Sequence, residues 1–190
     1  MDAQSRARQL VIPEQIETER MILRAARAED VTEVFAAVLE SVNELKPWMP
    51  WVHPEPKFDG SVEFHQAAQS KWVTRDMLDF QWLDKSSGNF IGKGGFHTIN
   101  WEVPKFEIGY WVRTSMASRG YCTEAVSALI AFSRQHFGAK RLEICSDPRN
   151  GKSRRVAERC GFTLEGILRQ NMRDPVGGLR DSCMYALVID

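Results

Sequence analysis

Phe106-Glu107-Ile108-Gly109-Tyr110-Trp111-Val112 is followed, after five residues, by Ser118-Arg119-Gly120-Tyr121-Cys122-Thr123-Glu124-Ala125, and these two segments decide the fold. The first segment is an apolar and aromatic run typical of a strand, and the second is a glycine turn that opens a helix. A helix N-terminus leaves backbone N–H groups unpaired at one spot, where the helix dipole adds partial positive charge. The pattern predicts a cradle for a phosphate or pyrophosphate, although a glycine at such a boundary can also serve the backbone alone.

Two further glycine-containing segments are close to known phosphate-binding motifs, but each lacks one residue. Gly92-Lys93-Gly94-Gly95 has His97 at the place of the last glycine of a dinucleotide-binding fingerprint. Gly151-Lys152-Ser153 has Ser146 at the place of the first glycine of a P-loop. Hydride transfer and nucleotide hydrolysis are therefore not indicated.

The composition is that of a soluble globular protein. With 190 residues, 43% of them hydrophobic, we expect a single domain over 1–190 with a flexible arm at 1–12. The 25 basic and 25 acidic residues balance, so no overall field favours nucleic acid or an anionic membrane as a partner. The four cysteines form no C-x-x-C pair, and no signal peptide or membrane span is evident. We expect a reduced, cytoplasmic protein without a metal site.

Hydrophobic periodicity and turn residues divide the chain into alternating elements. We expect strands at 20–26, 78–84, 90–99, 106–112, 141–145, 164–172 and 182–189. Helices are expected at 31–43, 61–74, 122–137 and 150–160. The short turns between 78 and 112 predict an antiparallel meander, and the strand–helix–strand passage from 106 to 145 predicts a parallel, right-handed crossover.

A proline-stiffened aromatic loop lies at Trp48-Met49-Pro50-Trp51-Val52-His53-Pro54. Two indoles so close together are difficult to bury in one small core, which favours an exposed aromatic wall over a pocket. An equally good interpretation is that one indole packs on the core and the other is incidental.

With these elements in place, the chain resembles a GNAT-superfamily acetyltransferase of the RimJ/RimL type, a group that acetylates the N-termini of ribosomal proteins. The matching segments occur in order and extend from about residue 17 to the end. They are Glu17-Thr18-Glu19-Arg20-Met21-Ile22-Leu23-Arg24, Pro47-Trp48-Met49-Pro50-Trp51, Glu107-Ile108-Gly109-Tyr110-Trp111-Val112, Arg119-Gly120-Tyr121-Cys122-Thr123-Glu124-Ala125, Asn150 with Ser153, Cys160-Gly161-Phe162, Leu164-Glu165-Gly166 and Met184-Tyr185-Ala186-Leu187.

The resemblance implies an α+β (mixed α/β) GNAT fold, with a central, mixed and mostly antiparallel seven-stranded sheet, splayed between strands 106–112 and 141–145, and helices on both faces. Acetyl-CoA would lie in the splay. Asn150 would hold its pantetheine arm from one side, and Ser153 would lie near the thioester sulfur. The implied backbone contacts to the arm are Tyr110, Trp111 and Val112, and those to the pyrophosphate are Arg119, Gly120, Tyr121, Cys122 and Thr123.

The implied reaction is direct attack of a primary amine on the thioester in a ternary complex. A free α-amine has a pKa of about 7.7–8, so part of it is neutral at cellular pH. Ser153 is the candidate acid on the sulfur side, and Glu107 is the candidate base, directly or through water. Glu107 can instead be a structural carboxylate bonded to nearby backbone. We expect Trp48, Trp51 and His53 to contact the acceptor.

Three positions depart from the family pattern. Ala117 stands where the pyrophosphate loop usually has Gln or Arg, and Ser118 replaces a common glycine. Met172 stands where some relatives have an acidic residue, which leaves the identity of the base open.

These patterns favour an acetyl-CoA-dependent N-acetyltransferase that acts on a protein N-terminus or on a small-molecule amine, as a monomer or a homodimer. The alternative is a catalytically weak acyl-CoA-binding sensor or scaffold, which the departures above would suit. A nucleic-acid-binding module would need a basic face, and the 3′-phosphate of CoA explains the basic residues between 149 and 155 with fewer assumptions.

Overall fold

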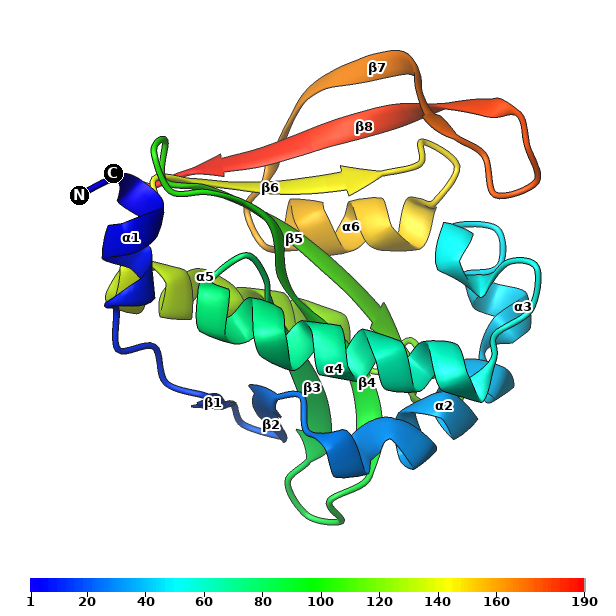
Figure 1. Ribbon diagram of the computed structural model, residues 1–190. Helices are drawn as coiled ribbons and strands as arrows, with labels where there is room; N and C mark the ends of the chain where they lie inside the picture. The colour runs from blue at the N-terminus through cyan, green and yellow to red at the C-terminus, as the bar shows by residue number, and fades with distance from the viewer. Residues whose placement is uncertain (190) are drawn as a thin grey trace.

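The protein is built around one mixed sheet of eight strands (Figure 1). The computed structural model describes residues 1–189. The strand order is β1-β2-β3-β4-β5-β6-β8-β7, and every neighbouring pair is antiparallel except β5 and β6. The strands are β1 (Gln15–Glu17), β2 (Met21–Ala25), β3 (Leu78–Asp84), β4 (Phe90–Asn100), β5 (Lys105–Val112), β6 (Arg141–Ser146), β7 (Thr163–Arg173) and β8 (Leu179–Val188).

Helices cover both faces of the sheet. In Figure 1, α4 crosses in front of the sheet with α2 beside it, and α5 lies behind. The helices are α1 (Ala3–Arg8), α2 (Val31–Glu40), α3 (Val42–Leu45), α4 (Phe58–Thr74), α5 (Tyr121–Phe137) and α6 (Gly151–Arg159), with short 3₁₀ helices η1 (Ala28–Asp30), η2 (Pro50–Val52) and η3 (Thr114–Met116). Across residues 1–189, none of these helices has the length and apolar character that crossing a bilayer requires.

The mixed, mostly antiparallel sheet expected from the sequence is confirmed, but it has eight strands instead of seven. The additional strand is β1, whose three residues pair with β2 from Gln15 opposite Arg24 to Glu17 opposite Ile22. Three residues are too few for an alternating pattern to be recognised in a sequence. The helix expected at 31–43 is interrupted at Ser41, where α2 ends and α3 begins.

The segment 1–12, expected to be a flexible arm, contains α1. Asp2 caps this helix by accepting a 2.7 Å hydrogen bond from the Ser5 N–H. Ala3 and Ala7 are buried, and Ile12 belongs to the main core. Two alanines and one isoleucine present too little apolar surface to reveal such packing in the sequence.

The sheet opens between its two halves at the boundary of β5 and β6. These parallel strands, joined through α5, pair only from Lys105 opposite Arg141 to Glu107 opposite Glu143. Beyond Glu107, residues 108–112 of β5 keep β4 as a neighbour but have no strand on their other edge within residues 1–189. The parallel crossover and the splay expected from the sequence are thereby confirmed.

Side chains of β5 alternate between two hydrophobic clusters. Phe106 and Ile108 belong to the main core, which includes Leu129 of α5, and Tyr110 packs against it. Trp111 belongs to a second cluster with residues of α2 and η2. Because neighbouring strand residues point to opposite faces, the even-numbered residues of β5 define a core face, and Glu107, Gly109 and Trp111 define what we call the acceptor face.

Glycines in β4 allow the neighbouring strands to approach closely. A single methyl group added at one of them should therefore have a large effect on stability. A Cβ atom at Gly95 would overlap the Leu78 carbonyl oxygen, whereas one at Gly166 in β7 would meet nothing within 4 Å. We expect Gly95→Ala to lower the free energy of unfolding by about 1–3 kcal/mol, because the backbone of β3 must shift. Gly166→Ala is the matched control and should change it little. Urea denaturation of both variants measures the difference, and equal stabilities would contradict the prediction.

Candidate active site

The turn before α5 presents a row of unpaired backbone donors. Gly120 precedes the helix with a φ of +85°, which glycine adopts without strain. The Glu124 N–H donates to the Gly120 carbonyl at 3.1 Å. Within residues 1–189, the N–H groups of residues 119–123 have no hydrogen-bond acceptor. These donors, at the positive end of a 17-residue helix, fit the two phosphates of a pyrophosphate.

Ala117 and Ser118, the unusual residues of this turn, still allow its backbone conformation, at a moderate cost in free energy. Ser118 has a φ of +62°, in the left-handed region where glycine is common. A residue with a Cβ atom pays about 1 kcal/mol for that conformation. Ala117 is extended, and its N–H donates to the Thr114 carbonyl at 3.1 Å. The loop therefore keeps its donors without the residues that the family usually has there.

A clamp of charged groups fixes the turn against the N-terminal segment. The Glu124 carboxylate accepts hydrogen bonds from the Thr18 hydroxyl at 2.6 Å, the Arg20 N–H at 2.9 Å and the Arg20 Nε at 2.7 Å. Arg20 also donates to the Arg119 carbonyl at 3.0 Å and covers the Tyr121 ring at 4.5 Å. Burial would raise the pKa of Glu124, but these hydrogen bonds outweigh it and hold the pKa below its usual value.

A pair of hydroxyl groups lies on the core face of the splay. The Tyr110 and Ser153 hydroxyl oxygens are 3.1 Å apart, and the Tyr110 hydroxyl also donates to the Ser153 carbonyl at 3.2 Å. Because the Tyr110 hydroxyl has one proton and donates it to the Ser153 carbonyl, the hydrogen bond between the two hydroxyl groups uses the proton of Ser153. Burial raises the pKa of Tyr110 far above its usual value, so its hydroxyl stays protonated. The sequence predicted a backbone role for Tyr110 and missed its side chain.

Asn150 acts as the N-cap of α6. Its Oδ1 atom accepts a 3.1 Å hydrogen bond from the Ser153 N–H. Its side-chain amide nitrogen has no acceptor within residues 1–189. The cap thus fixes the first turn of α6, which carries the Ser153 hydroxyl toward β5.

Glu107 lies on the acceptor face at the last paired position of β5. Its neighbour on β6, Glu143, is neutralised by Arg141 at 2.7 Å and Lys105 at 3.4 Å. Glu107 has no ion pair or hydrogen bond through its side chain in the described part of the chain. Burial raises the pKa of Cys145 on β6, and the negative charge of Glu107 contributes to that increase. Glu107 therefore lies where the two strands diverge, without a charged partner in the described residues.

The aromatic loop connects both halves of the splayed sheet. Trp51, which is half exposed, packs on Trp111 of β5 with ring centroids 6.1 Å apart. The Trp48 carbonyl accepts a 3.2 Å hydrogen bond from Arg180 of β8. His53 contacts the Lys46 carbonyl through Nε2 at 3.0 Å and so closes the loop. Trp48, Trp51 and His53 thus lie on one loop, of which Trp51 packs against the acceptor face.

Sequence reasoning missed a buried charge network next to this loop. Arg180, with a side chain 10% exposed, lies 3.7 Å from the Asp147 carboxylate, which is 2% exposed. Arg149 binds the same carboxylate at 2.7 Å and Asp174 at 2.9 Å. Met172 pairs with Arg180 across β7 and β8. The network joins two segments, 147–149 and 172–180, that are far apart in sequence, and the pairing of β6 with β8 brings them together.

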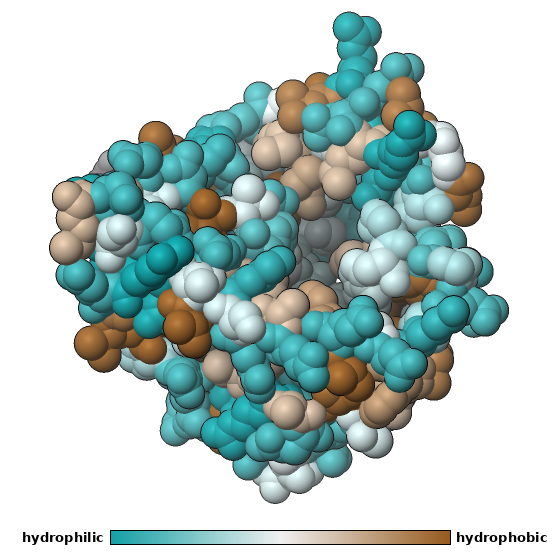
Figure 2. All heavy atoms as spheres, viewed as in Figure 1, coloured by the Kyte–Doolittle hydropathy of each residue, from teal (hydrophilic) through white to brown (hydrophobic). Residues whose placement is uncertain are grey.

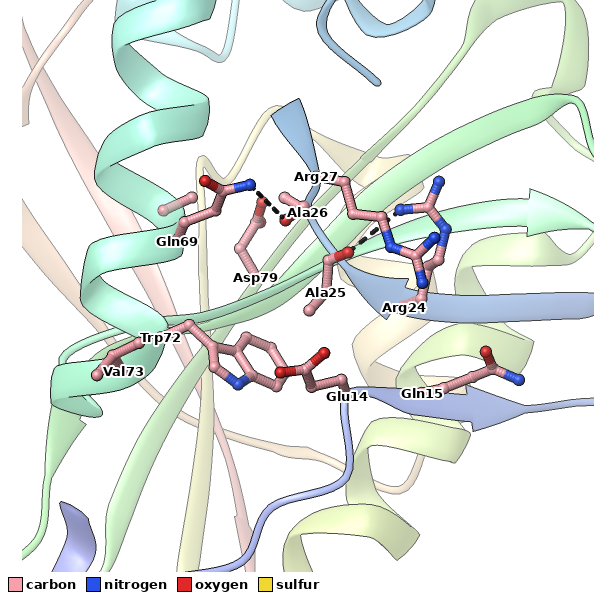
Figure 3. A pocket seen from close by; sticks show the side chains of 11 residues that line it. Glu14, Gln15, Arg24, Ala25, Ala26, Arg27, Gln69, Trp72, Val73 and Asp79 are labelled. Carbon is pink, nitrogen blue, oxygen red and sulfur yellow. Dashed lines mark hydrogen bonds between the residues drawn. The ribbon is translucent and has the colours of Figure 1, made fainter. Parts of the chain in front are cut away.

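Two cavities lie apart from the splay. One of about 310 Å³ lies between α4 and the β1–β2 edge, where Figure 3 shows Trp72 of α4 facing Glu14 and Gln69 pointing to Ala26. The other, of about 440 Å³, lies near α1 and the β4–β5 turn. Neither contains Tyr110, Ser153 or the 117–120 turn. The candidate site is instead an open cleft, and Figure 2 shows the α4 side of the molecule hollowed near its centre.

Comparison with known proteins identifies the family of this chain. The model of the family described as "Acetyltransferase (GNAT) domain" matches residues 20–163. The chain therefore belongs to the GNAT acetyltransferase family and is an N-acetyltransferase, whose acetyl donor is acetyl-CoA.

Two relatives support the RimJ/RimL type expected from the sequence. The chain is 31% identical over 133 residues to the ribosomal-protein-serine acetyltransferase of Escherichia coli K12, covering 69% of this chain and 68% of that protein. It is 24% identical over 170 residues to the putative ribosomal N-acetyltransferase YdaF of Bacillus subtilis 168, covering 88% and 90%.

Solved structures confirm the fold. A RimL ribosomal L7/L12 alpha-N-protein acetyltransferase in complex with coenzyme A superposes with a TM-score of 0.88 at 24% identity, covering 93% of this chain and 99% of that one. The microcin C7 self-immunity acetyltransferase MccE, in complex with acetyl-CoA and AMP, gives a TM-score of 0.87 at 24% identity, covering 94% and 98%.

The clamp predicts a selective loss of donor affinity. We expect Glu124→Ala to raise KM for acetyl-CoA roughly tenfold, because about 1–2 kcal/mol of loop ordering is lost. Glu19→Ala, at an exposed carboxylate on the same segment, should leave KM unchanged. Because the pKa of Glu124 is lowered, the clamp is complete at neutral pH and is lost as the pH falls through that pKa. Equal KM values for both variants at pH 7 would contradict this role.

The hydroxyl pair predicts a loss of turnover without a loss of binding. We expect Tyr110→Phe to lower kcat about 10- to 100-fold with little change in KM, because Ser153 loses the group that orients its hydroxyl. Tyr185→Phe is the control: this second tyrosine bonds Arg154 and Glu158 of α6 and should affect stability more than kcat. Steady-state thiol release with thermal melting measures both variants. A normal kcat for Tyr110→Phe would exclude the pair from catalysis.

Proposed function

We propose that the protein transfers the acetyl group of acetyl-CoA to the α-amine of a protein N-terminus, by direct attack in a ternary complex. The observation that carries the proposal is the splay after Glu107. It combines an open strand edge, unpaired amides of residues 119–123 at one end and the Ser153 hydroxyl on the core face. A long thioester with a pyrophosphate at its far end requires the same layout.

In this proposal acetyl-CoA binds along the open edge of β5. The backbone of Tyr110, Trp111 and Val112 hydrogen-bonds the pantetheine arm as an added strand would, because no strand of residues 1–189 pairs with this edge. The amides of residues 119–123 hold the pyrophosphate, and Asn150 offers its free side-chain N–H groups from α6. Bound there, acetyl-CoA supplies an acetyl group activated as a thioester.

In this proposal the two proton transfers take place on opposite faces of β5. On the core face, the Ser153 hydroxyl, which bonds Tyr110 before the reaction, turns to the departing sulfur and supplies it with a proton. On the acceptor face, a proton acceptor must take the proton of the incoming ammonium, and Glu107 is one candidate for it. A backbone N–H of β5 would stabilise the negative charge on the carbonyl oxygen.

The open cleft supports a chain end as the acceptor. A protein N-terminus needs an entrance wide enough for its following residues, and the half-exposed Trp51 offers it an apolar wall. The Glu107 carboxylate, which has no ion pair among the described residues, attracts a cationic terminus. The names of the two relatives, which refer to ribosomal proteins, point to the same acceptor class.

A small aromatic amine is the second candidate acceptor. The half-exposed indole of Trp51, which packs on Trp111 at a tilt of 49°, presents an aromatic surface beside the splay, as a nucleoside-like compound would need. The MccE structure, solved with AMP, has the same fold.

A thiol-release assay decides between these acceptors. Acetyl-CoA is offered with N-terminal peptides of ribosomal proteins, aminoacyl-nucleotide analogues, polyamines and amino acids, and each active pair is repeated with Ser153→Ala. We expect release with peptides that falls about 10- to 100-fold in Ser153→Ala, since an acid is lost. Release only with nucleotide analogues would move the acceptor to the second class. Tight CoA binding without release from any acceptor would support an acyl-CoA sensor.

A further inference from the structure

A β-bulge in β4 places His97 directly over Gly109 of β5. Phe96 pairs with Ile108 and Thr98 pairs with Glu107, so His97 is the extra residue between two consecutive pairs. A Cβ atom at Gly109 would overlap Nε2 of His97 and lie 2.6 Å from its Cδ2 atom. The imidazole therefore occupies the place that a side chain at position 109 would take. Bulges commonly re-aim a side chain beside an active site.

This position lies at the centre of the candidate site. Gly109 follows the last pair between β5 and β6 by two residues, so the imidazole covers the part of β5 whose outer edge is open. It lies on the acceptor face, on the opposite side of the strand from Tyr110 and Ser153. The His97 side chain is exposed and can be reached by an acceptor.

Nε2 of the His97 ring has no hydrogen-bond partner within residues 1–189. Nδ1 of His97 lies 3.3 Å from the Thr98 hydroxyl oxygen. With the proton on Nδ1 donated to Thr98, Nε2 keeps an unshared electron pair close to Gly109. Histidine is the side chain that most often accepts protons in catalysis.

Charged groups lie on the elements that surround the imidazole. The charged groups on the surrounding elements are Lys93, Lys105, Glu107, Asp79, Glu143 and Asp2. Lys93 pairs with Asp79 at 2.7 Å, and Lys105 pairs with Glu143 at 3.4 Å. Glu107, two residues before Gly109 on the same face, is left without an ion pair in residues 1–189, and its negative charge attracts a cationic acceptor toward the imidazole.

We infer that His97 is the base of acetyl transfer, an assignment that rests on the proposed function. The acceptor arrives as R–NH3⁺ and gives one proton to Nε2 of His97. The freed electron pair forms the N–C bond, the C–S bond breaks, and its electron pair leaves on sulfur. The second proton lost from nitrogen balances the one that sulfur takes up. The products are the N-acetyl amide, the CoA thiol and one proton, which His97 passes to solvent. The Glu107 carboxylate attracts the cationic ammonium group of the acceptor.

The first test compares two histidine variants across pH. We expect His97→Gln to lower kcat/KM for the acceptor about 100-fold at pH 7, with KM for acetyl-CoA and thermal stability unchanged. The deficit should shrink above pH 9, where most of an amine with a pKa of about 8 is already neutral. His136→Gln, at the far end of α5, is the matched control and should match the wild type. A deficit that is absent, or equal at every pH, would overturn the assignment.

A double-mutant cycle makes the test independent of folding defects. Gly109→Ala displaces the imidazole, so it should lower kcat/KM in the wild type and have less than a threefold effect in His97→Gln, since the base is already gone. Fully additive effects would show that the contact between the two residues has no catalytic role.

Failure of the proposed acceptor and failure of the base can be told apart. If the wild type acetylates nucleotide analogues but no peptide, the acceptor proposal fails, and the pH comparison is made on the analogue. If no amine reacts, the comparison is made on the hydrolysis of acetyl-CoA, in which water gives its proton to the same nitrogen. His97→Gln should then slow hydrolysis about tenfold or more. Unchanged hydrolysis would overturn the role of His97.

Discussion

The brief pairing of β5 with β6 is the constraint on which the rest of the structure depends. Three residue pairs join the two halves of the sheet, and after Glu107 the strands diverge. Unpaired backbone groups at such an edge are costly unless water or a ligand satisfies them. The same divergence leaves the start of α5 and the start of α6 facing one opening. A binding site for an extended molecule is thus a direct consequence of the short pairing between β5 and β6.

The alternation of side chains along β5 determines on which face of the strand each functional group lies. Tyr110 projects to the core face, where it meets Ser153, and Glu107 and Trp111 project to the other face. Gly109 carries no side chain, and the bulge in β4 fills its place with an imidazole from the neighbouring strand. The leaving group and the acceptor therefore meet different residues, although both meet the same strand. One residue more or less in the bulge would exchange the two faces.

Much of the fold and part of the site could be predicted from the sequence, for identifiable reasons. Long periodic elements such as α5, and the glycine turn at Gly120, have strong local signals. Short elements such as β1 and α1 have none, because three paired residues or two buried alanines leave no periodicity. His97 and Arg180 were missed for another reason. Their positions depend on strand register, and one extra residue in a pair of strands cannot be recognised in a single sequence.

The aromatic loop and the Arg180 network are best understood as setting the width of the splay. Ion pairs as buried as Asp147 with Arg180 contribute little net stability, because desolvation offsets their attraction. They do fix geometry: Arg180 holds the Trp48 carbonyl from β8, while Trp51 packs on Trp111 of β5. One short loop is thereby attached to both halves of the sheet, across the boundary where β5 and β6 diverge. The aromatic loop and the open edge of β5 are therefore held in place by the same contacts. A displacement of either one should displace the other.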